Sequence, residues 1–268
     1  MRVMAFTAVL ISCITFSATA FEKNDMKTLL EKGTCIDCDL RQSKMHSLMI
    51  PNANLTESRL RDSVLKHINL ENALLVETDL RRSDLEKANL SGANLTGATL
   101  RETDLEKSKL TNAIFNDADL RDADLENASA VGSSFESADL RKANMKRGNF
   151  SESDFSNANM TDSNFKRAIL SNATFKNARM NNIRLTRAVM PGSNFEDANL
   201  TMAVFYRTDL KDSVFTDANM KGTVLFGSNL SGADLSGADN LEQSQLKNAC
   251  GDKTTKLPED LYIGMCKN

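Results

Sequence analysis

The sequence lacks tryptophan and has few aromatic, histidine or proline residues. Two tyrosines, two histidines and three prolines occur in 268 residues, and aromatic residues make up 6% of the chain. So few aromatic side chains argue against the stacking platforms that bind single-stranded nucleic acid. Two histidines and a single C-x-x-C exclude the common zinc sites. Because no Pro/Gly/Ser-rich linker interrupts the chain, we expect one continuous domain.

The chain also lacks a strong charge of one sign and, after its first twenty residues, any long apolar run. It carries 33 basic and 36 acidic residues, for a net charge of −3. This mild acidity argues against a nucleic-acid partner. No segment after residue 20 reaches the roughly 20 apolar residues of a membrane span, so we expect no transmembrane helix there.

Catalytic motifs are missing as well. The sequence has no G-x-S-x-G, H-E-x-x-H or Walker loop. We therefore expect no enzyme activity, with no catalytic residue, cofactor or metal ion.

What the sequence does contain is a five-residue repeat from Leu40 to Leu235. Every fifth residue, here called the centre, is apolar, and Ala130 is the only small one. The residue two before each centre is almost always Ala, Ser or Thr. A step of five would spread the apolar residues around an α-helix and alternate them across one long strand. The chain must therefore turn once per pentapeptide.

The position two after the centre indicates where the turn lies. It is rich in Asn, Asp and Gly, which tolerate a positive φ angle. We predict a short strand followed by a tight turn in each pentapeptide. The glycines at this position are Gly92, Gly97, Gly132, Gly192, Gly222, Gly227, Gly232 and Gly237.

Phenylalanine reveals how many pentapeptides make one coil. Six centres spaced by twenty residues are Phe115, Phe135, Phe155, Phe175, Phe195 and Phe215. This period predicts four pentapeptides per coil. The repeat then forms about ten coils, which at a strand spacing of about 4.8 Å make a rod about 48 Å long.

The repeat unit resembles that of a known family. Ala-Asn-Leu occurs at 88–90 and 93–95, and Ala-Asp-Leu at 118–120, 123–125, 138–140 and 233–235. These match the A(D/N)Lxx consensus of the pentapeptide-repeat family, and the resemblance covers residues 36–240. It implies an all-β fold, a right-handed quadrilateral parallel β-helix.

Residues 1–20 are typical of a secretory signal peptide. Arg2 precedes an apolar run over residues 3–16, and Ala-Thr-Ala at 18–20 supplies a cleavage site. We expect a periplasmic or secreted protein. Leu-Ile-Ser-Cys at 10–13 resembles a lipobox, so a lipid anchor through Cys13 is the alternative.

A short helix is predicted within residues 21–35, as a cap on the exposed N-terminal end of the core. Asp25 can begin this helix and Gly33 can end it. Met26, Leu29 and Leu30 would share its buried face.

The regular repeat ends at residue 240, and residues 241–268 are predicted to form an irregular C-terminal cap. Residues 250–268 should leave the repeat. We expect Leu257, Pro258, Leu261, Tyr262 and Ile263 to cover the far end of the core.

Four cysteines remain after signal removal, an even number in an oxidising compartment. Haem attachment at Cys35 and Cys38 fails because Asp39 follows them in place of histidine. The rod ends lie about 48 Å apart, beyond disulfide reach. We therefore predict the local pairs Cys35–Cys38 and Cys250–Cys266.

A column of arginines is the clearest outward feature. It comprises Arg41, Arg61, Arg81, Arg101, Arg121 and Arg141. Nearby aspartates could neutralise the column and leave a solvated face. The alternative is a docking stripe for an acidic protein partner.

Two further surfaces lie nearer the C-terminus. Lys146 and Lys166 share a face with a second basic column, which we expect to be solvated: Arg147, Arg167, Arg187 and Arg207. Four apolar residues point outward on the last coils: Val204, Tyr206, Val224 and Phe226. The C-terminal tail could cover them, or they could form a homodimer contact.

The sequence thus predicts an exported, non-enzymatic solenoid that acts as a protein-interaction or structural scaffold. The alternative is a DNA-mimicking protector of a topoisomerase, as the resemblance allows. Such a mimic would be strongly acidic and cytoplasmic, which the signal peptide and the arginine columns argue against.

Overall fold

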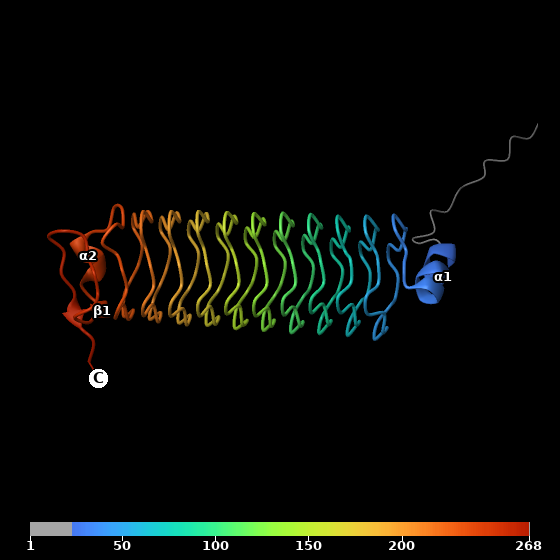
Figure 1. The fold of residues 1–268 in the computed structure, drawn as a ribbon, viewed down its shortest axis with the longest axis horizontal. Helices are drawn as coiled ribbons and strands as arrows, with labels where there is room; N and C mark the ends of the chain where they lie inside the picture. The colour runs from blue at the N-terminus through green and yellow to red at the C-terminus, as the bar shows by residue number, and fades with distance from the viewer. Residues whose placement is uncertain (1–22, 268) are drawn as a thin grey trace, which may run out of the picture.

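The computed structural model describes residues 23–267, which form a rod of stacked coils (Figure 1). Helix α1 (Lys23–Lys32) lies at the N-terminal end. Helix α2 (Gln243–Leu246) and the short strands β1 (Cys250–Gly251) and β2 (Gly264–Met265) lie at the other end. The predicted signal peptide and Cys13 fall outside the described residues.

Successive coils pair residues that are twenty apart. Parallel bridges join Asp39 to Arg59 and, farther along, Leu74 to Asn94. The Leu40 amide donates to the Arg59 carbonyl at 2.8 Å, and the Arg59 amide donates to the Cys38 carbonyl at 2.8 Å. This register confirms the predicted period of twenty, so four pentapeptides complete one coil.

The predicted short strand in each pentapeptide is wrong in extent. Along the repeat only the residue before each centre forms a bridge. The two residues after each centre form a turn. The amide of the following small residue closes this turn, as Ser43 does onto the Leu40 carbonyl at 3.2 Å. Gln42 in this turn has a φ of 57°. A corner every five residues leaves no length for a continuous strand.

The same turn position takes a positive φ almost throughout, and no β-branched residue occupies it. A branched Cβ clashes in this region of backbone space. Gly237 departs from the prediction, because positive φ is found at Asn240 instead. The corner itself remains, because the Ala238 amide still donates to the Leu235 carbonyl at 2.9 Å.

The centres form the core of the rod. The rings of Phe115 and Phe135 stack with centroids 4.9 Å apart, and every centre phenylalanine is fully buried. In the small position, most hydroxyl groups donate to a carbonyl of the preceding coil, as Ser83 does to Leu60 at 2.6 Å, whereas Ser108 and Ser163 donate to the carbonyl three residues earlier. A buried serine or threonine therefore keeps its hydrogen bond.

Helix α1 joins the first coil differently from the prediction. It begins at Lys23, and the Asp25 carboxylate accepts a hydrogen bond from the Asp39 amide at 2.8 Å instead of capping the helix. Leu29 is fully buried, whereas Leu30 is 53% exposed, so its predicted burial is wrong. Gly33, with a φ of 65°, follows the last helical residue.

The C-terminal tail pairs with the last coils outside the regular register. Bridges join Asn229 to Cys250 and Asp234 to Lys256, at spacings longer than twenty. Leu257, Leu261 and Ile263 pack against the core. Tyr262 is 73% exposed, so its predicted role in covering the core is wrong.

Both pairs of cysteines in the described chain are joined. Cys35 and Cys38 have Cα atoms 5.5 Å apart, and Cys250 and Cys266 have Cα atoms 4.7 Å apart. The second disulfide attaches strand β2 to strand β1, which pair in parallel.

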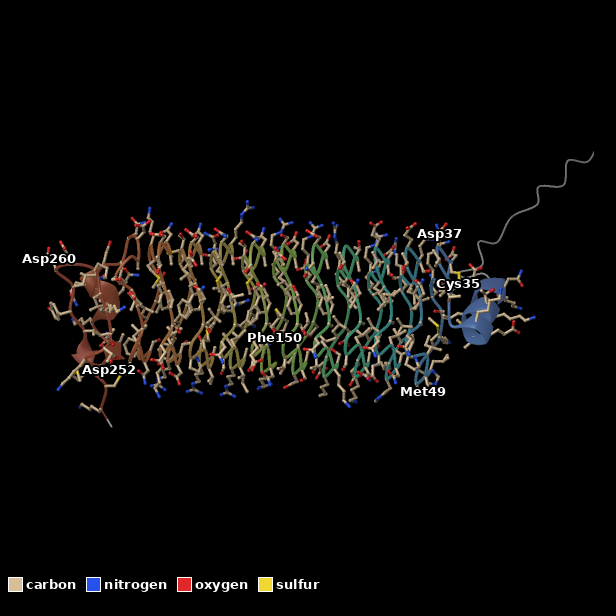
Figure 2. The ribbon with its side chains drawn as sticks, in the orientation of Figure 1. Cys35, Asp37, Met49, Phe150, Asp252 and Asp260 are labelled. Carbon is tan, nitrogen blue, oxygen red and sulfur yellow. A yellow bond between two sulfur atoms is a disulfide. The ribbon has the colours of Figure 1, made fainter. Side chains whose placement is uncertain are left out.

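Asp252 organises the loop that follows β1 at the C-terminal end of the rod (Figure 2). Its carboxylate accepts hydrogen bonds from the Thr254 hydroxyl at 2.6 Å and the Gly232 amide at 3.1 Å. These bonds, led by that from Thr254, lower the pKa of Asp252 to about 2.

We expect the Asp252 carboxylate to make the free energy of unfolding depend on pH in the acidic range. Because the folded pKa is depressed, the stabilisation is present above the ordinary pKa of 3.8 and is lost as the pH falls toward 2. Asp252→Asn should flatten that part of the profile. Thermal unfolding midpoints of both proteins, measured across this interval, check the prediction. Equal acid sensitivity would contradict it.

Within residues 23–267, no helix combines the length and apolar character needed to cross a membrane.

Candidate docking surface

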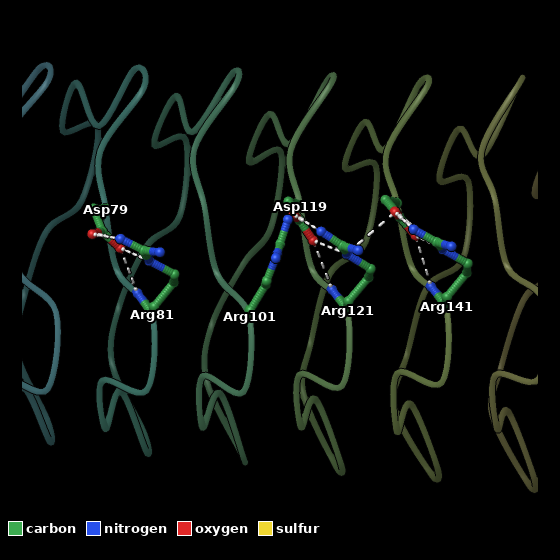
Figure 3. A network of polar contacts seen from close by, with 7 residues as sticks. Asp79, Arg81, Arg101, Asp119, Arg121 and Arg141 are labelled. Atoms are coloured by element: carbon green, nitrogen blue, oxygen red, sulfur yellow. Dashed lines mark hydrogen bonds and ion pairs between the residues drawn. The ribbon is translucent and has the colours of Figure 1, made fainter.

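The first arginine column is an ion-pair ladder (Figure 3). Arg81 Nη2 lies 2.5 Å from Asp79 Oδ2, and Arg121 and Arg141 pair in the same way with the aspartate two residues earlier, at 2.8 and 2.6 Å. Arg101 instead reaches the Asp119 carboxylate of the next coil. These arginines are therefore neutralised by their own chain.

The two remaining members of the column are also paired. Arg41 Nη2 lies 2.5 Å from Asp39 Oδ2, and its hydrogen bonds hold the pKa of Asp39 below its ordinary value. Arg61 Nε lies 3.2 Å from Asp62 Oδ2 without hydrogen-bond geometry. The column thus has the structure of the solvated, mutually paired face rather than that of a free docking stripe.

A different face of the rod carries unbalanced charge. We call it the charged face, and it consists of the residues that flank the centres from Leu65 to Phe205 at steps of twenty. Its N-terminal part, the acidic half, contains three lysines, Lys66, Lys87 and Lys107, beside six carboxylates: Asp84, Glu86, Asp104, Glu106, Asp124 and Glu126. Its C-terminal part, the basic half, contains Lys146, Arg147, Lys166, Arg167, Arg184, Arg187 and Arg207. No carboxylate stands among the outward positions of the basic half.

Most cations of the basic half have no anionic partner. Lys146 and Arg147 reach back to Glu126 at 3.5 and 2.8 Å. In the part of the chain that the structure describes, no ion pair involves the other five: Lys166, Arg167, Arg184, Arg187 and Arg207. All five side chains are exposed.

The basic half surrounds a groove of about 400 Å³. Lys146, Lys166, Arg187 and Tyr206 are among its lining residues. Positive charges gathered in a groove raise the local potential and attract an anionic group. The Arg207 guanidinium stands 5.2 Å from the centroid of the Tyr206 ring, so an aromatic surface closes the C-terminal end of the groove.

The acidic half is only partly neutralised. Lys66 lies 2.8 Å from Glu86 and 3.1 Å from Asp84. Lys87 lies 2.9 Å from Glu86, and Lys107 lies 2.6 Å from Glu106. Asp104 has no ion pair within residues 23–267. Burial, and then the neighbouring carboxylates of Asp84 and Asp124, raise the pKa of Asp104. This half of the face therefore retains negative charge.

The predicted apolar cluster continues the charged face toward the C-terminus. The rings of Tyr206 and Phe226 stack 5.4 Å apart. Val224 and Phe226 remain 41% and 45% exposed. Helix α2 approaches but leaves a hollow of about 270 Å³, lined by Val224, Phe226 and Gln245 among others. The tail thus does not cover this cluster.

A local sequence difference distinguishes the paired arginine ladder from the basic half. In the ladder, four arginines follow an aspartate by two residues, as in Asp79-Leu80-Arg81. Both side chains of this motif project from the same side of the coil. In the basic half, asparagine takes the aspartate position, as in Asn144 and Asn164. Sequence reasoning treated both columns alike and missed this difference.

Within the described residues, no group of three or more His, Cys, Asp or Glu side chains is placed to hold a metal ion.

The sequence matches one family model, described as pentapeptide repeats. Eight copies match, and together they cover residues 52–239. No curated protein matches the chain by sequence.

Solved structures of similar shape include HetL, a pentapeptide repeat protein involved in heterocyst differentiation regulation from the cyanobacterium Nostoc sp.. It is 23% identical, with a TM-score of 0.63, over 78% of this chain and 94% of HetL. QnrB1, a plasmid-mediated fluoroquinolone resistance protein, is 18% identical over 71% of this chain and 91% of its own, with a TM-score of 0.46. At these identities the likeness to HetL shows the fold alone.

Proposed function

The chain belongs to the pentapeptide-repeat family, and we propose that it is a non-enzymatic, exported scaffold that docks an acidic protein surface on its basic half. The observation that carries the proposal is the groove lined by lysines and arginines, of which Lys166, Arg167 and Arg187 have no ion pair within the described residues. In the arginine ladder, by contrast, the chain neutralises its own charges. Cations that lack an ion pair in this fold are candidates for binding the carboxylates of a partner protein.

The physical case rests on what the groove offers. Arginine and lysine side chains at successive coils present donors about 4.8 Å apart, which suits a row of carboxylates on a partner. Arginine can bind a carboxylate through two parallel hydrogen bonds. Tyr206 and Phe226 add apolar surface at one end. Such a surface binds through charge and is weakened by salt.

Export is the second part of the proposal. It is supported by the signal-like residues 1–20 and by two disulfides in the folded chain, since disulfides persist in oxidising compartments. N-terminal sequencing of the protein from separated cell fractions tests it. The proposal predicts that the protein found outside the cytoplasm begins at Phe21. In this mature protein we expect a cap at each end of the rod. An uncleaved cytoplasmic chain would contradict export.

Topoisomerase protection by DNA mimicry fits the surface less well. A mimic needs continuous negative charge along the rod. Here one column alternates Asp79 with Arg81, and the charged face ends in the groove of lysines and arginines.

A pull-down from envelope extract tests the docking surface. Lys166→Glu/Arg187→Glu reverses two groove cations, and Arg81→Glu/Arg121→Glu reverses the same number in the ladder as a matched control. We expect the groove variant to lose the wild-type partner and the control to keep it. If both variants retain the partner equally, the groove is not the docking surface.

A further inference from the structure

We propose that the acidic surface recognised by the basic half is the acidic half of a second copy of this chain, in an antiparallel, face-to-face dimer. This inference rests on the proposed docking role of the basic half. It arises because one face of the rod carries an excess of carboxylates toward its N-terminal end and an excess of cations toward its C-terminal end.

The symmetry of such a dimer follows from the coil geometry. A two-fold axis that lies in the interface and crosses the rod turns one copy end for end. Each outward column then faces the same column of the partner. The column before the centres faces its counterpart, and so does the column after them. The dimer is isologous, so every contact occurs twice.

One position of the two-fold axis places residues of opposite charge against each other. With the axis between the coils of Leu125 and Met145, Glu126 of one copy faces Lys146 of the other. One coil farther out Glu106 faces Lys166, and two coils out Asp84 faces Arg184. Lys166 and Arg184 lack an ion pair within the described chain, and these contacts would supply one.

Neighbouring positions of the axis are unfavourable. An axis through the coil of Leu125 places Glu126 opposite its own copy, and an axis through the coil of Met145 does the same for Lys146. A full step toward either end brings Glu106 against Glu126, or Lys146 against Lys166. Because like charges repel at these distances, the charge pattern favours the register between the two coils, in which no charged residue of the two columns beside the centres faces a like charge.

The ends of the contact are also complementary. Val64 is 36% exposed and would face the outward Val204 of the other copy, while Lys66 would face the Tyr206 ring. These contacts would bury an exposed valine and add a cation–π interaction. The corner column, which lies two residues after the centres, stands at the rim, where Lys107 approaches Arg167 and Lys87 approaches Arg187. Water and salt screen this repulsion between exposed side chains.

The area predicts a weak dimer. The paired stretch spans about 34 Å of rod, and one side of a coil is about 10 Å wide. This contact is small compared with stable interfaces, which bury roughly 1,200–2,000 Å² in total. Opposite charges must therefore supply most of the attraction, and the dimer should dissociate as salt is raised.

A charge swap between two variants tests the inference. Glu106→Lys places two lysines opposite each other at both copies of the contact, and Lys166→Glu places two glutamates there. Each variant alone should be monomeric under conditions in which the wild type dimerises. Mixed in equal amounts, they should form a heterodimer, because each lysine of one then faces a glutamate of the other.

Sedimentation velocity at about 50 mM and about 500 mM salt provides the measurement, because the Debye length shortens and the attraction between opposite charges weakens as salt is raised. Glu102→Lys and Lys142→Glu, exposed charges at corners outside the charged face, are the matched controls and should dimerise like the wild type. A wild-type monomer at low salt, or a dimer that neither charged-face variant disturbs, would overturn the inference. A monomer that still captures an acidic envelope protein on the groove would overturn the dimer and leave the proposed function standing.

Discussion

Phe155→Ala should lower the free energy of unfolding by about 3–5 kcal/mol, the range for removing a buried aromatic ring. Phe155 is fully buried. Its ring stacks on Phe135 at 4.9 Å and on Phe175 at 5.3 Å. It also meets the edges of Phe150 and Phe165 at 6.1 and 5.9 Å. Alanine would leave a cavity in the middle of this cluster.

The chain offers a matched control in Phe226→Ala, which removes the same side chain from an exposed position. Phe226 is 45% exposed and stacks on Tyr206, so we expect a loss of about 1 kcal/mol or less. Urea unfolding followed by circular dichroism compares the two variants with the wild type. Similar losses for both would contradict the phenylalanine column as the core of the rod.

Removal of the C-terminal disulfide should produce the second large effect. Cys250 and Cys266 are 16 residues apart in sequence. Closing a loop of this length stabilises a folded protein by about 3 kcal/mol, mainly because it restricts the unfolded chain. Cys250→Ala/Cys266→Ala should therefore lower the unfolding free energy by about this amount, and it should release strand β2 from strand β1.

Limited proteolysis locates that effect. Without the disulfide, cleavage should begin between residues 251 and 265, while residues 40–235 stay resistant. The Cys35–Cys38 pair, separated by three residues, closes a shorter loop, and its removal should cost less. First cleavage in the middle of the rod would contradict the assignment of the disulfide to the C-terminal end.

The architecture of the rod could be predicted from the sequence because one physical requirement recurs in every pentapeptide. Each coil must bury a large side chain and turn at a corner, so residues such as Phe115 and Ala118 occupy fixed positions. Their spacing gave the period of twenty, which the bridges confirm. Segments outside the repeat carry no such redundancy. This is why the exposure of Leu30 and Tyr262 and the pairing of Lys256 with Asp234 were not foreseen.

The candidate site was harder to predict because the repeat places charge outward everywhere. A column of arginines has the same period whether or not its members are paired. The difference lies in one neighbouring position, aspartate at 119 before Arg121 and asparagine at 144 before Lys146. Only the side-chain geometry shows that the first arrangement closes an ion pair at 2.8 Å while most of the basic half stays without one.

Cross-linking with a zero-length carbodiimide reagent, followed by mass mapping, tests the role of the charged face most directly. Within one rod Glu106 and Lys166 are three coils apart, about 14 Å, beyond the reach of a direct amide bond. Lys146 and Glu126 are 3.5 Å apart in the same chain and provide the internal control. A mixture of normal and isotope-labelled chains distinguishes links between copies from links within one. The account predicts a Glu106–Lys166 link that joins labelled to unlabelled chains and disappears at high salt. Recovery of the Glu126–Lys146 link alone, at any salt concentration, would contradict it.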